Sequence, residues 1–373
     1  MKQLLIGGRV WHADGSFTEN DSILLDGGQI LATGAECTRY DADETVDITG
    51  MTVLPGLVDV HTHGRIGFDF DEASQEQMLA MKEDYARHGV TSVFATLASA
   101  TQEQWLKSIR AIEACGYDGI HLEGRYLNPG KRGAHAMELL TAADASDLET
   151  VLKEIHVPCH VTVAAELDRD GSFAAKALEY GATLGLGHTC ATAEEARIAV
   201  QNGVTSFTHL FNAMPPLHHR DGGAVSVCLN GAGYGELIVD GVHICPDMVR
   251  LAYRCMGKDR TVLITDSMAA TNCGDGNYSI AGRPVVVKNG RALTLDGIIS
   301  GSTLNLWDGV KNLMAFAGIG LADAVACATI NPARMVGIDR TVGSIETGKR
   351  ANLLVVNDQL DICRVILHGE TLK

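Results

Sequence analysis

The sequence predicts an α/β fold: a (β/α)8 TIM-type barrel with a small discontinuous β-sandwich domain built from both termini. Three observations support this prediction. β-type runs alternate with helical stretches through the middle of the 373-residue chain, short strand-like runs occupy both ends, and metal-capable side chains follow several of the central runs. A chain of this length buries about three quarters of its unfolded surface, so it needs no disulfide staples to fold.

The two ends of the chain carry similar strand-and-turn patterns. Short apolar runs such as Leu4–Ile6 and Ile23–Leu25 precede Gly pairs, and the last residues include 353–356 and 365–367, which are equally apolar. Such runs separated by turns are typical of hairpins. Either set alone would leave an apolar face exposed, so we expect them to complete one small domain. The predicted boundaries are 1–50 and 342–373 for this domain and 51–341 for the barrel.

The middle of the chain contains eight β-type runs, most of them followed by helix-type sequence. The runs are Val53–His61, Thr91–Leu97, Gly119–Glu123, His160–Glu166, Thr183–His188, Ser206–His209, Glu236–Asp240 and Val262–Asp266. Eight such units are what a parallel barrel requires. A doubly wound sheet, the alternative, usually has a Gly-rich phosphate turn after its first strand, where this chain has His61-Thr62-His63. Asn289-Gly290 predicts a hairpin inserted at about 274–298.

The charge balance limits the partners. The chain has 30 basic and 46 acidic residues and a net charge of -16, which disfavours nucleic acid and anionic membranes but leaves room for a small anionic substrate. Its 10 Cys are scattered without a CxxC pair, as expected for reduced thiols in a cytoplasmic protein. No apolar run reaches about 18 residues, so no membrane span is expected.

Metal-capable or acid–base side chains lie at or near the ends of six of the eight runs. They are His61, His63, Glu123, His188, His209, His243 and Asp266. The carboxyl ends of barrel strands meet at one mouth, so we expect these side chains to converge. The chain has only 14 His, and five of them falling at these ends by chance is improbable.

His61 and His63 are two residues apart on a predicted strand and therefore point to the same face. Glu123, His188 and His209 end three other runs and would give one metal three protein ligands and an open position, the catalytic pattern for zinc. The alternative interpretation is that these are hydrogen-bonded core side chains.

Asp266 follows the apolar run Val262–Thr265. Beside a metal, it would act as general base and later as general acid for a water whose pKa zinc lowers to about 7. A role as a helix N-cap is less well supported, because Ser267–Ala270 leads into a Gly-rich loop.

Two segments resemble signatures of the amidohydrolase superfamily: Pro55–Gly64, the strand-1 motif, and Gly343–Leu353, the closing motif. Within it the chain resembles the N-acetylglucosamine-6-phosphate deacetylase family over essentially its whole length. The segments that carry this second resemblance are 121–124, 131–135, 186–189, 208–216, 240–243, 265–267 and 300–302.

The resemblance implies hydrolysis of the acetamide of a 2-acetamido sugar 6-phosphate in amino sugar catabolism, by a homodimer. It implies Glu123, His188 and His209 as the main metal ligands and Asp266 as the catalytic acid/base. The implied substrate contacts are Ala134 and His135 near the acetamide, Asn212, Ala213, Arg220 and His243 at the sugar phosphate, and Ile299, Ser300 and Gly301 through backbone groups. An alternative for Arg220 is an ion pair with Asp221 or solvent exposure.

The chain departs from the pattern of some members at two positions. Those members lack the strand-1 imidazoles and use one metal, whereas His61 and His63 are present here. We therefore expect two divalent ions, zinc before other metals, with His61, His63 and Asp266 at the second site and Glu123 bridging. Asn352 stands where the superfamily often has Asp, and nothing functional depends on it.

Three rival functions remain open at this stage. The same chemistry could act on N-acetylgalactosamine 6-phosphate, which differs by the orientation of one hydroxyl. Cyclic amidases usually carry a carboxylated Lys at the end of strand 4, where this chain has Ala165-Glu166. A non-catalytic sugar-phosphate-binding protein would keep the barrel without the activity.

The two-metal interpretation predicts that metal analysis of the fully loaded protein returns two ions per chain. A single ion per chain would remove the second site and its His61–His63 ligands, while leaving the deacetylase assignment intact.

Overall fold

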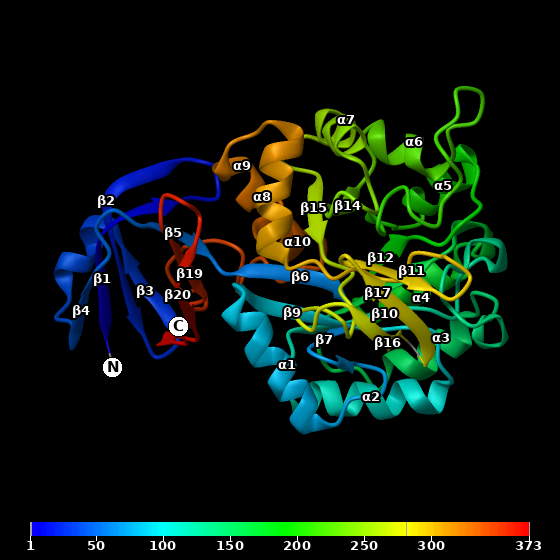
Figure 1. The fold of residues 1–373 in the computed structure, drawn as a ribbon, viewed down its shortest axis with the longest axis horizontal. Helices are drawn as coiled ribbons and strands as arrows, with labels where there is room; N and C mark the ends of the chain where they lie inside the picture. The colour runs from blue at the N-terminus through cyan, green and yellow to red at the C-terminus, as the bar shows by residue number, and fades with distance from the viewer. Residues whose placement is uncertain (1, 281, 373) are drawn as a thin grey trace.

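The computed structural model describes residues 2–280 and 282–372, and it shows two bodies, a large barrel and a smaller sheet (Figure 1). Eight parallel strands form the barrel wall in the order β15-β14-β13-β12-β11-β10-β9-β6. Their bounds are β6 Leu57–Thr62, β9 Val90–Leu97, β10 Gly119–Glu123, β11 Cys159–Val163, β12 Thr183–Leu186, β13 Ser206–Phe207, β14 Tyr234–Ile238 and β15 Thr261–Ile264. A parallel bridge between Thr62 and Ser267 joins the two edges. The predicted barrel is confirmed.

Helices cover the outside of the barrel. They are α1 Gln75–Arg87, α2 Gln102–Ala114, α3 Ala145–Leu152, α4 Ser172–Glu179, α5 Ala193–Gln201, α6 Gly223–Leu229, α7 Pro246–Met256, α8 Leu306–Ala317, α9 Leu321–Ala326 and α10 Ile330–Met335. Capping boxes led by Ser74, Thr101 and Thr192 start α1, α2 and α5, and Pro246 begins α7. Among the described residues no helix has the length and apolarity needed to cross a membrane.

The smaller body is one sheet made from both ends of the chain, in the order β21-β20-β19-β5-β1-β2-β3 with β4 beside β1. Its strands are β1 Gln3–Trp11, β2 Phe17–Asp26, β3 Gln29–Thr33, β4 Glu44–Asp47, β5 Thr52–Pro55, β19 Leu353–Val356, β20 Ile362–Leu367 and β21 Glu370–Thr371. Ile30 exchanges backbone hydrogen bonds with Gly348 and Lys349, so the β3 edge returns to the C-terminal segment. The sheet thus folds over its own core, and the predicted β domain built from both termini is confirmed.

The first predicted barrel strand, Val53–His61, is in fact two strands. β5 pairs with β1 and β19 in the terminal sheet, and only β6 belongs to the barrel. Gly56 separates them, and a Cβ at this residue would lie 2.1 Å from the Thr91 hydroxyl, so only glycine lets the chain pass. We therefore propose that the N-terminal domain boundary lies at Gly56 rather than at 50/51; the boundary at 342 remains a prediction.

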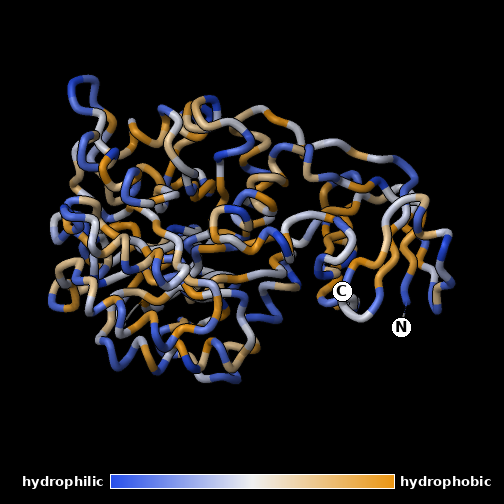
Figure 2. Tube along the Cα trace, turned by 180° about the vertical axis from the view of Figure 1, so that it is seen from behind, coloured by the Kyte–Doolittle hydropathy of each residue, from blue (hydrophilic) through white to orange (hydrophobic). Residues whose placement is uncertain are grey.

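Strand β19 contributes to the cores of both bodies. Leu353 and Val355 pack in the terminal core, while Leu354 and Val356 pack in the barrel core. This alternation follows from the two-residue period of a strand. Hydrophobic stretches run along the inner strands of both bodies and hydrophilic residues cluster at the outer turns (Figure 2). Trp11 of β1, Leu54 of β5 and Val365 of β20 also pack in the barrel core, so several strands of the terminal sheet fasten the two bodies together.

The insertion after the eighth barrel strand has three antiparallel strands rather than the two of the predicted hairpin: β16 Gly276–Ile280, β17 Arg283–Lys288 and β18 Arg291–Thr294. Asn289 and Gly290 both have positive φ, 51° and 70°, as a two-residue hairpin turn requires. The Arg283 guanidinium donates a 2.8 Å hydrogen bond to the Ala134 carbonyl. A two-stranded ribbon, β7 Gly64–Arg65 with β8 Phe68–Asp69, follows β6.

Replacing Leu354 with Ala should lower the free energy of unfolding by about 2 to 5 kcal/mol, because a fully buried side chain leaves a cavity on the barrel side of β19. Denaturant unfolding at fixed metal loading measures the change. Leu79→Ala, at a side chain 52% exposed, is the matched control and should change it by no more than about 0.5 kcal/mol. Equal effects of the two variants would contradict the shared-strand packing.

Candidate functional site

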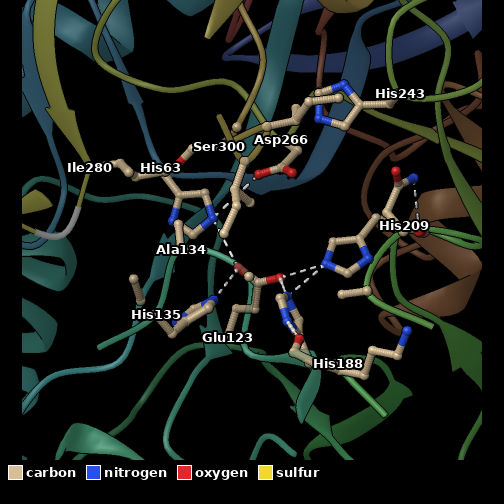
Figure 3. A pocket seen from close by; sticks show the side chains of 18 of the residues that line it. His63, Glu123, Ala134, His135, His188, His209, His243, Asp266, Ile280 and Ser300 are labelled. Atoms are coloured by element: carbon tan, nitrogen blue, oxygen red, sulfur yellow. Dashed lines mark hydrogen bonds and ion pairs between the residues drawn. The ribbon is translucent and has the colours of Figure 1, made fainter. Parts of the chain in front are cut away.

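The ligand-type side chains converge at the carboxyl mouth of the barrel (Figure 3). Glu123 is the last residue of β10, while His188, His209 and Asp266 each come two residues after β12, β13 and β15. These three residues have positive φ, 46°, 33° and 49°. Such backbone is uncommon outside glycine and gathers at functional sites. The predicted strands ended at these three residues, whereas the observed strands end two residues earlier and the three residues lie in the loops that follow.

One oxygen of Glu123 faces a pair of imidazoles. Its Oε1 lies 3.1 Å from His188 Nε2 and 2.9 Å from His209 Nε2, and the two nitrogens are 3.0 Å apart. The Nδ1 of His188 is 2.7 Å from the Lys131 carbonyl, which can only accept, so Nδ1 carries the proton. The Nε2 lone pair of His188 is therefore free to bind a cation, as in metal-ligating histidines.

The other oxygen of Glu123 faces the second pair. Its Oε2 lies 3.0 Å from His63 Nε2 and 3.4 Å from His61 Nε2, and Asp266 Oδ1 lies 3.4 and 3.5 Å from the same two nitrogens. All four side chains are buried. Glu123 thus stands between two groups of ligand-type atoms, the arrangement predicted for a bridging carboxylate.

This donor set fits a divalent metal. Ligands about 2.0 to 2.1 Å from a tetrahedral ion lie about 3.3 Å from one another, which matches the separations on both sides of Glu123. Among the described residues, His61 Nε2, which faces the Glu123 and Asp266 carboxylates, has no hydrogen-bond partner. A buried nitrogen left so is costly unless a cation binds its lone pair. Imidazole and carboxylate ligands suit zinc and neighbouring first-row metals.

The electrostatics of the site favour positive charge. Burial opposes ionisation of Glu123, yet the neighbouring imidazoles, His61 first, hold the pKa of this carboxyl well below its ordinary value. Burial likewise opposes the charged form of His63, but Asp266 and Glu123 raise the pKa of its imidazole to about 10. The pKa of Asp266 is lowered against burial by His61 and His63, so it is a carboxylate at neutral pH. A site with these preferences is prepared for a cation.

His135 differs from the other imidazoles at the mouth. The Ser99 backbone N–H donates to its Nδ1 at 3.3 Å, so the ring proton is on Nε2, which lies 3.6 Å from Glu123 Oε2. Burial lowers the pKa of His135 to about 4, so the ring stays neutral. His135 is therefore a neutral N–H donor directed at the cavity.

The ligand groups lie in the wall of a cavity of about 370 Å³. Most of the predicted substrate contacts line the same cavity: Ala134, His135, Asn212, Ala213, His243, Ile299, Ser300 and Gly301. Their contacts with a substrate remain predictions. His61 lies behind His63, fully buried.

Arg220 is not at this cavity. It is exposed, and with His218 and His219 it lines a separate surface depression. Sequence reasoning placed it with the phosphate contacts, and the structure does not bring it to the site of its own chain.

Several wall residues were not singled out from the sequence. Ala98, Lys131 and Ile280 line the cavity, and the Asp240 carboxylate accepts a 2.7 Å hydrogen bond from His243 Nδ1. The segments around Lys131 and Asp240 were part of the recognised motifs. Ile280 comes from the insertion, whose only sequence signal was a turn.

Comparisons with known proteins agree with this geometry. The sequence profile of the amidohydrolase family matches residues 52–372. The N-acetylglucosamine-6-phosphate deacetylase of Mus musculus is 32% identical over 89% of this chain and 86% of its own. The N-acetylgalactosamine-6-phosphate deacetylase of Escherichia coli O157:H7 is also 32% identical, over 85% and 87%. An alanine variant of the Mycobacterium smegmatis N-acetylglucosamine-6-phosphate deacetylase, solved with N-acetyl-D-glucosamine 6-phosphate, superimposes with a TM-score of 0.92 at 31% identity over 100% of this chain and 99% of that one.

Proposed function

The chain belongs to the amidohydrolase family, and we propose that it is a metal-dependent deacetylase that converts N-acetylglucosamine 6-phosphate to glucosamine 6-phosphate and acetate in amino sugar catabolism. The observation that carries this is the position of Asp266 and Glu123, which face paired imidazoles in the wall of a cavity of small-molecule size. The sugar-phosphate substrate follows from the full-length similarity to a structure that holds it.

Zinc is the metal we propose, with two ions per chain. The first site would be Glu123, His188 and His209; the second would be His61, His63 and Asp266 with the other oxygen of Glu123. When bound, such a metal supplies Lewis acidity, which polarises an amide carbonyl and lowers the pKa of water.

Asp266 carries the proton transfers. At neutral pH its carboxylate is ionised, because His61 and His63 lower its pKa against the effect of burial. It accepts a proton from the attacking water at Oδ1 or Oδ2 and then returns it to the departing amine. A positioned base of this kind commonly contributes about 10² to 10⁴-fold in rate.

His135 stabilises the charge that develops on the carbonyl oxygen. Its Nε2–H faces the cavity, and Ser99 holds the ring in that tautomer. Because the ring is neutral, it donates a hydrogen bond without giving up a proton, the property needed of an oxyanion donor.

The sugar-phosphate end binds away from the reacting bond and orients it. Asn212, Ala213 and His243 lie in the cavity wall. Burial would lower the pKa of His243, but its hydrogen bond with Asp240 raises it, which favours the imidazolium beside a phosphate.

We also propose a cytoplasmic homodimer. Arg220 is exposed and lies outside the cavity of its own chain, while a guanidinium is the side chain best suited to a phosphate. In a dimer, Arg220 would serve the cavity of the second subunit. Light scattering gives the oligomeric state directly.

N-acetylgalactosamine 6-phosphate is the second candidate substrate. The Escherichia coli O157:H7 N-acetylgalactosamine-6-phosphate deacetylase is as similar to this chain, at 32% identity, as the Mus musculus N-acetylglucosamine-6-phosphate deacetylase. A cyclic amidase is disfavoured, because no Lys follows β11 to bridge metals. Glu166, three residues after that strand, accepts hydrogen bonds from Asn128 and Thr189.

Acetate release from a substrate panel tests the function. The panel is the 6-phosphates of N-acetylglucosamine and N-acetylgalactosamine, unphosphorylated N-acetylglucosamine, and the cyclic amides dihydroorotate and hydantoin, with ring opening followed for the last two. We expect the highest kcat/KM on N-acetylglucosamine 6-phosphate and a large loss without the phosphate. Preference for the galacto epimer selects the second candidate, and turnover of a cyclic amide alone rejects both.

Asp266→Asn should reduce turnover by at least about two orders of magnitude while the ion at Glu123, His188 and His209 is retained, because the amide cannot accept the water's proton. Steady-state kinetics and metal analysis measure both. Asp247→Asn, at a side chain 91% exposed, is the matched control. Near-normal turnover of Asp266→Asn would remove Asp266 from the proton transfers.

A further inference from the structure

A second polar layer lies inside the barrel beneath the metal-ligand layer. His121 precedes Glu123 by two residues on β10, and His61, on β6, precedes by two residues His63, which lies just beyond the end of that strand. The rings of His61 and His121 are fully buried, and their centroids are 4.5 Å apart. Glu236, on β14, joins them as a carboxylate with no exposed surface. The interior of a barrel is ordinarily filled by branched apolar side chains, so a carboxylate at this depth calls for a reason.

The two oxygens of Glu236 have different surroundings. Its Oε1 accepts a 2.9 Å hydrogen bond from the Ser206 hydroxyl and lies 3.5 Å from His160 Nε2. Its Oε2 has no hydrogen-bond partner among the described residues and lies 3.8 Å from His61 Nδ1, which has none either. No Lys or Arg of the described residues forms an ion pair with Glu236. Glu236 Oε2, an acceptor without a hydrogen-bond partner, therefore faces His61 Nδ1, a ring nitrogen that can carry a proton and has no partner either.

A buried carboxylate is stable only with a compensating positive charge. The far nitrogen of His61 faces Glu123 and Asp266, where the proposed second metal would bind. An imidazole that donates one N–H to a carboxylate and offers its other nitrogen to a metal is the arrangement that fixes the orientation of ligating histidines. A shift of under about 1 Å brings His61 Nδ1 within hydrogen-bond distance of Glu236.

We infer that Glu236 is a positioning residue for the second metal site: its carboxylate accepts the Nδ1 proton of His61 and so keeps His61 Nε2 unprotonated and directed at the ion. This inference rests on the two-metal form of the proposed function. The first site has a separate support, since the Lys131 carbonyl holds His188, so Glu236 acts on the second ion selectively.

Glu236→Gln tests the selectivity, because the amide keeps the volume and removes the charge. Apoproteins are titrated with Zn²⁺ against a chromophoric chelator, and acetate release is assayed in parallel. We expect the second ion to bind about 10 to 100-fold more weakly, and the first to bind as in the wild type. The matched control is Thr162→Val, which removes a buried hydroxyl that bonds His121 and Thr208 in the same layer, and it should leave both ions unaffected.

Three results with the variants would overturn the inference: two ions held by Glu236→Gln with wild-type affinities, equal weakening of both ions, or the same weakening in Thr162→Val. A wild-type protein that binds a single ion also overturns it, whether or not acetate is released. Failure of the deacetylase function shows separately, as a wild-type protein that holds two ions and releases no acetate.

A second measurement decides the matter if Glu236→Gln does not fold. In zinc-loaded wild-type protein labelled with ¹⁵N-histidine, the His61 ring should show a proton on Nδ1 and none on Nε2, with His61→Gln identifying the signal. An unprotonated Nδ1 would contradict the role of Glu236.

Discussion

The buried carboxylate of Glu123 constrains the whole mouth of the barrel. Each of its oxygens faces two imidazole nitrogens at 2.9 to 3.4 Å, and Asp266 adds a second carboxylate to one side. Carboxylates and imidazoles buried this close together are stable only with a positive charge that they share. His188 and Asp266 both reach this centre from left-handed backbone, which is strained in residues other than glycine.

The elements around this centre act through hydrogen bonds that leave little freedom. The Lys131 carbonyl and Ser99 fix opposite tautomers at His188 and His135, so one ring presents a lone pair and its neighbour presents a proton. Arg283 fastens the inserted sheet to the Ala134 carbonyl, and so the insertion and the loop that carries Ala134 and His135 form one wall of the cavity. Binding and chemistry share a rigid frame of this sort when reacting atoms must be placed to a fraction of an ångström.

Much of this was readable from the sequence, for physical reasons. The apolar runs before Glu123 and Asp266 predict two buried strands. The charged residue that follows each run marks where the strand reaches the mouth of the barrel. Other features depend on contacts between distant segments. The division of 53–61 at Gly56 is set by Thr91, the surroundings of Glu236 are set by strands across the barrel, and the exposure of Arg220 is set by its loop. The local sequence pattern predicts none of these three features, because each depends on how the folded chain places the segment.

The pairing of β5 with β19 has a consequence for how the chain is made. Pro55 pairs with Leu353, which follows it far along the chain, so β5 is synthesised long before its partner strand. Until then the N-terminal strands present an unpaired edge, the surface on which nascent chains aggregate. Completion of this sheet therefore waits for the synthesis of β19, and holdase chaperones are expected to act on β1 to β5 until then.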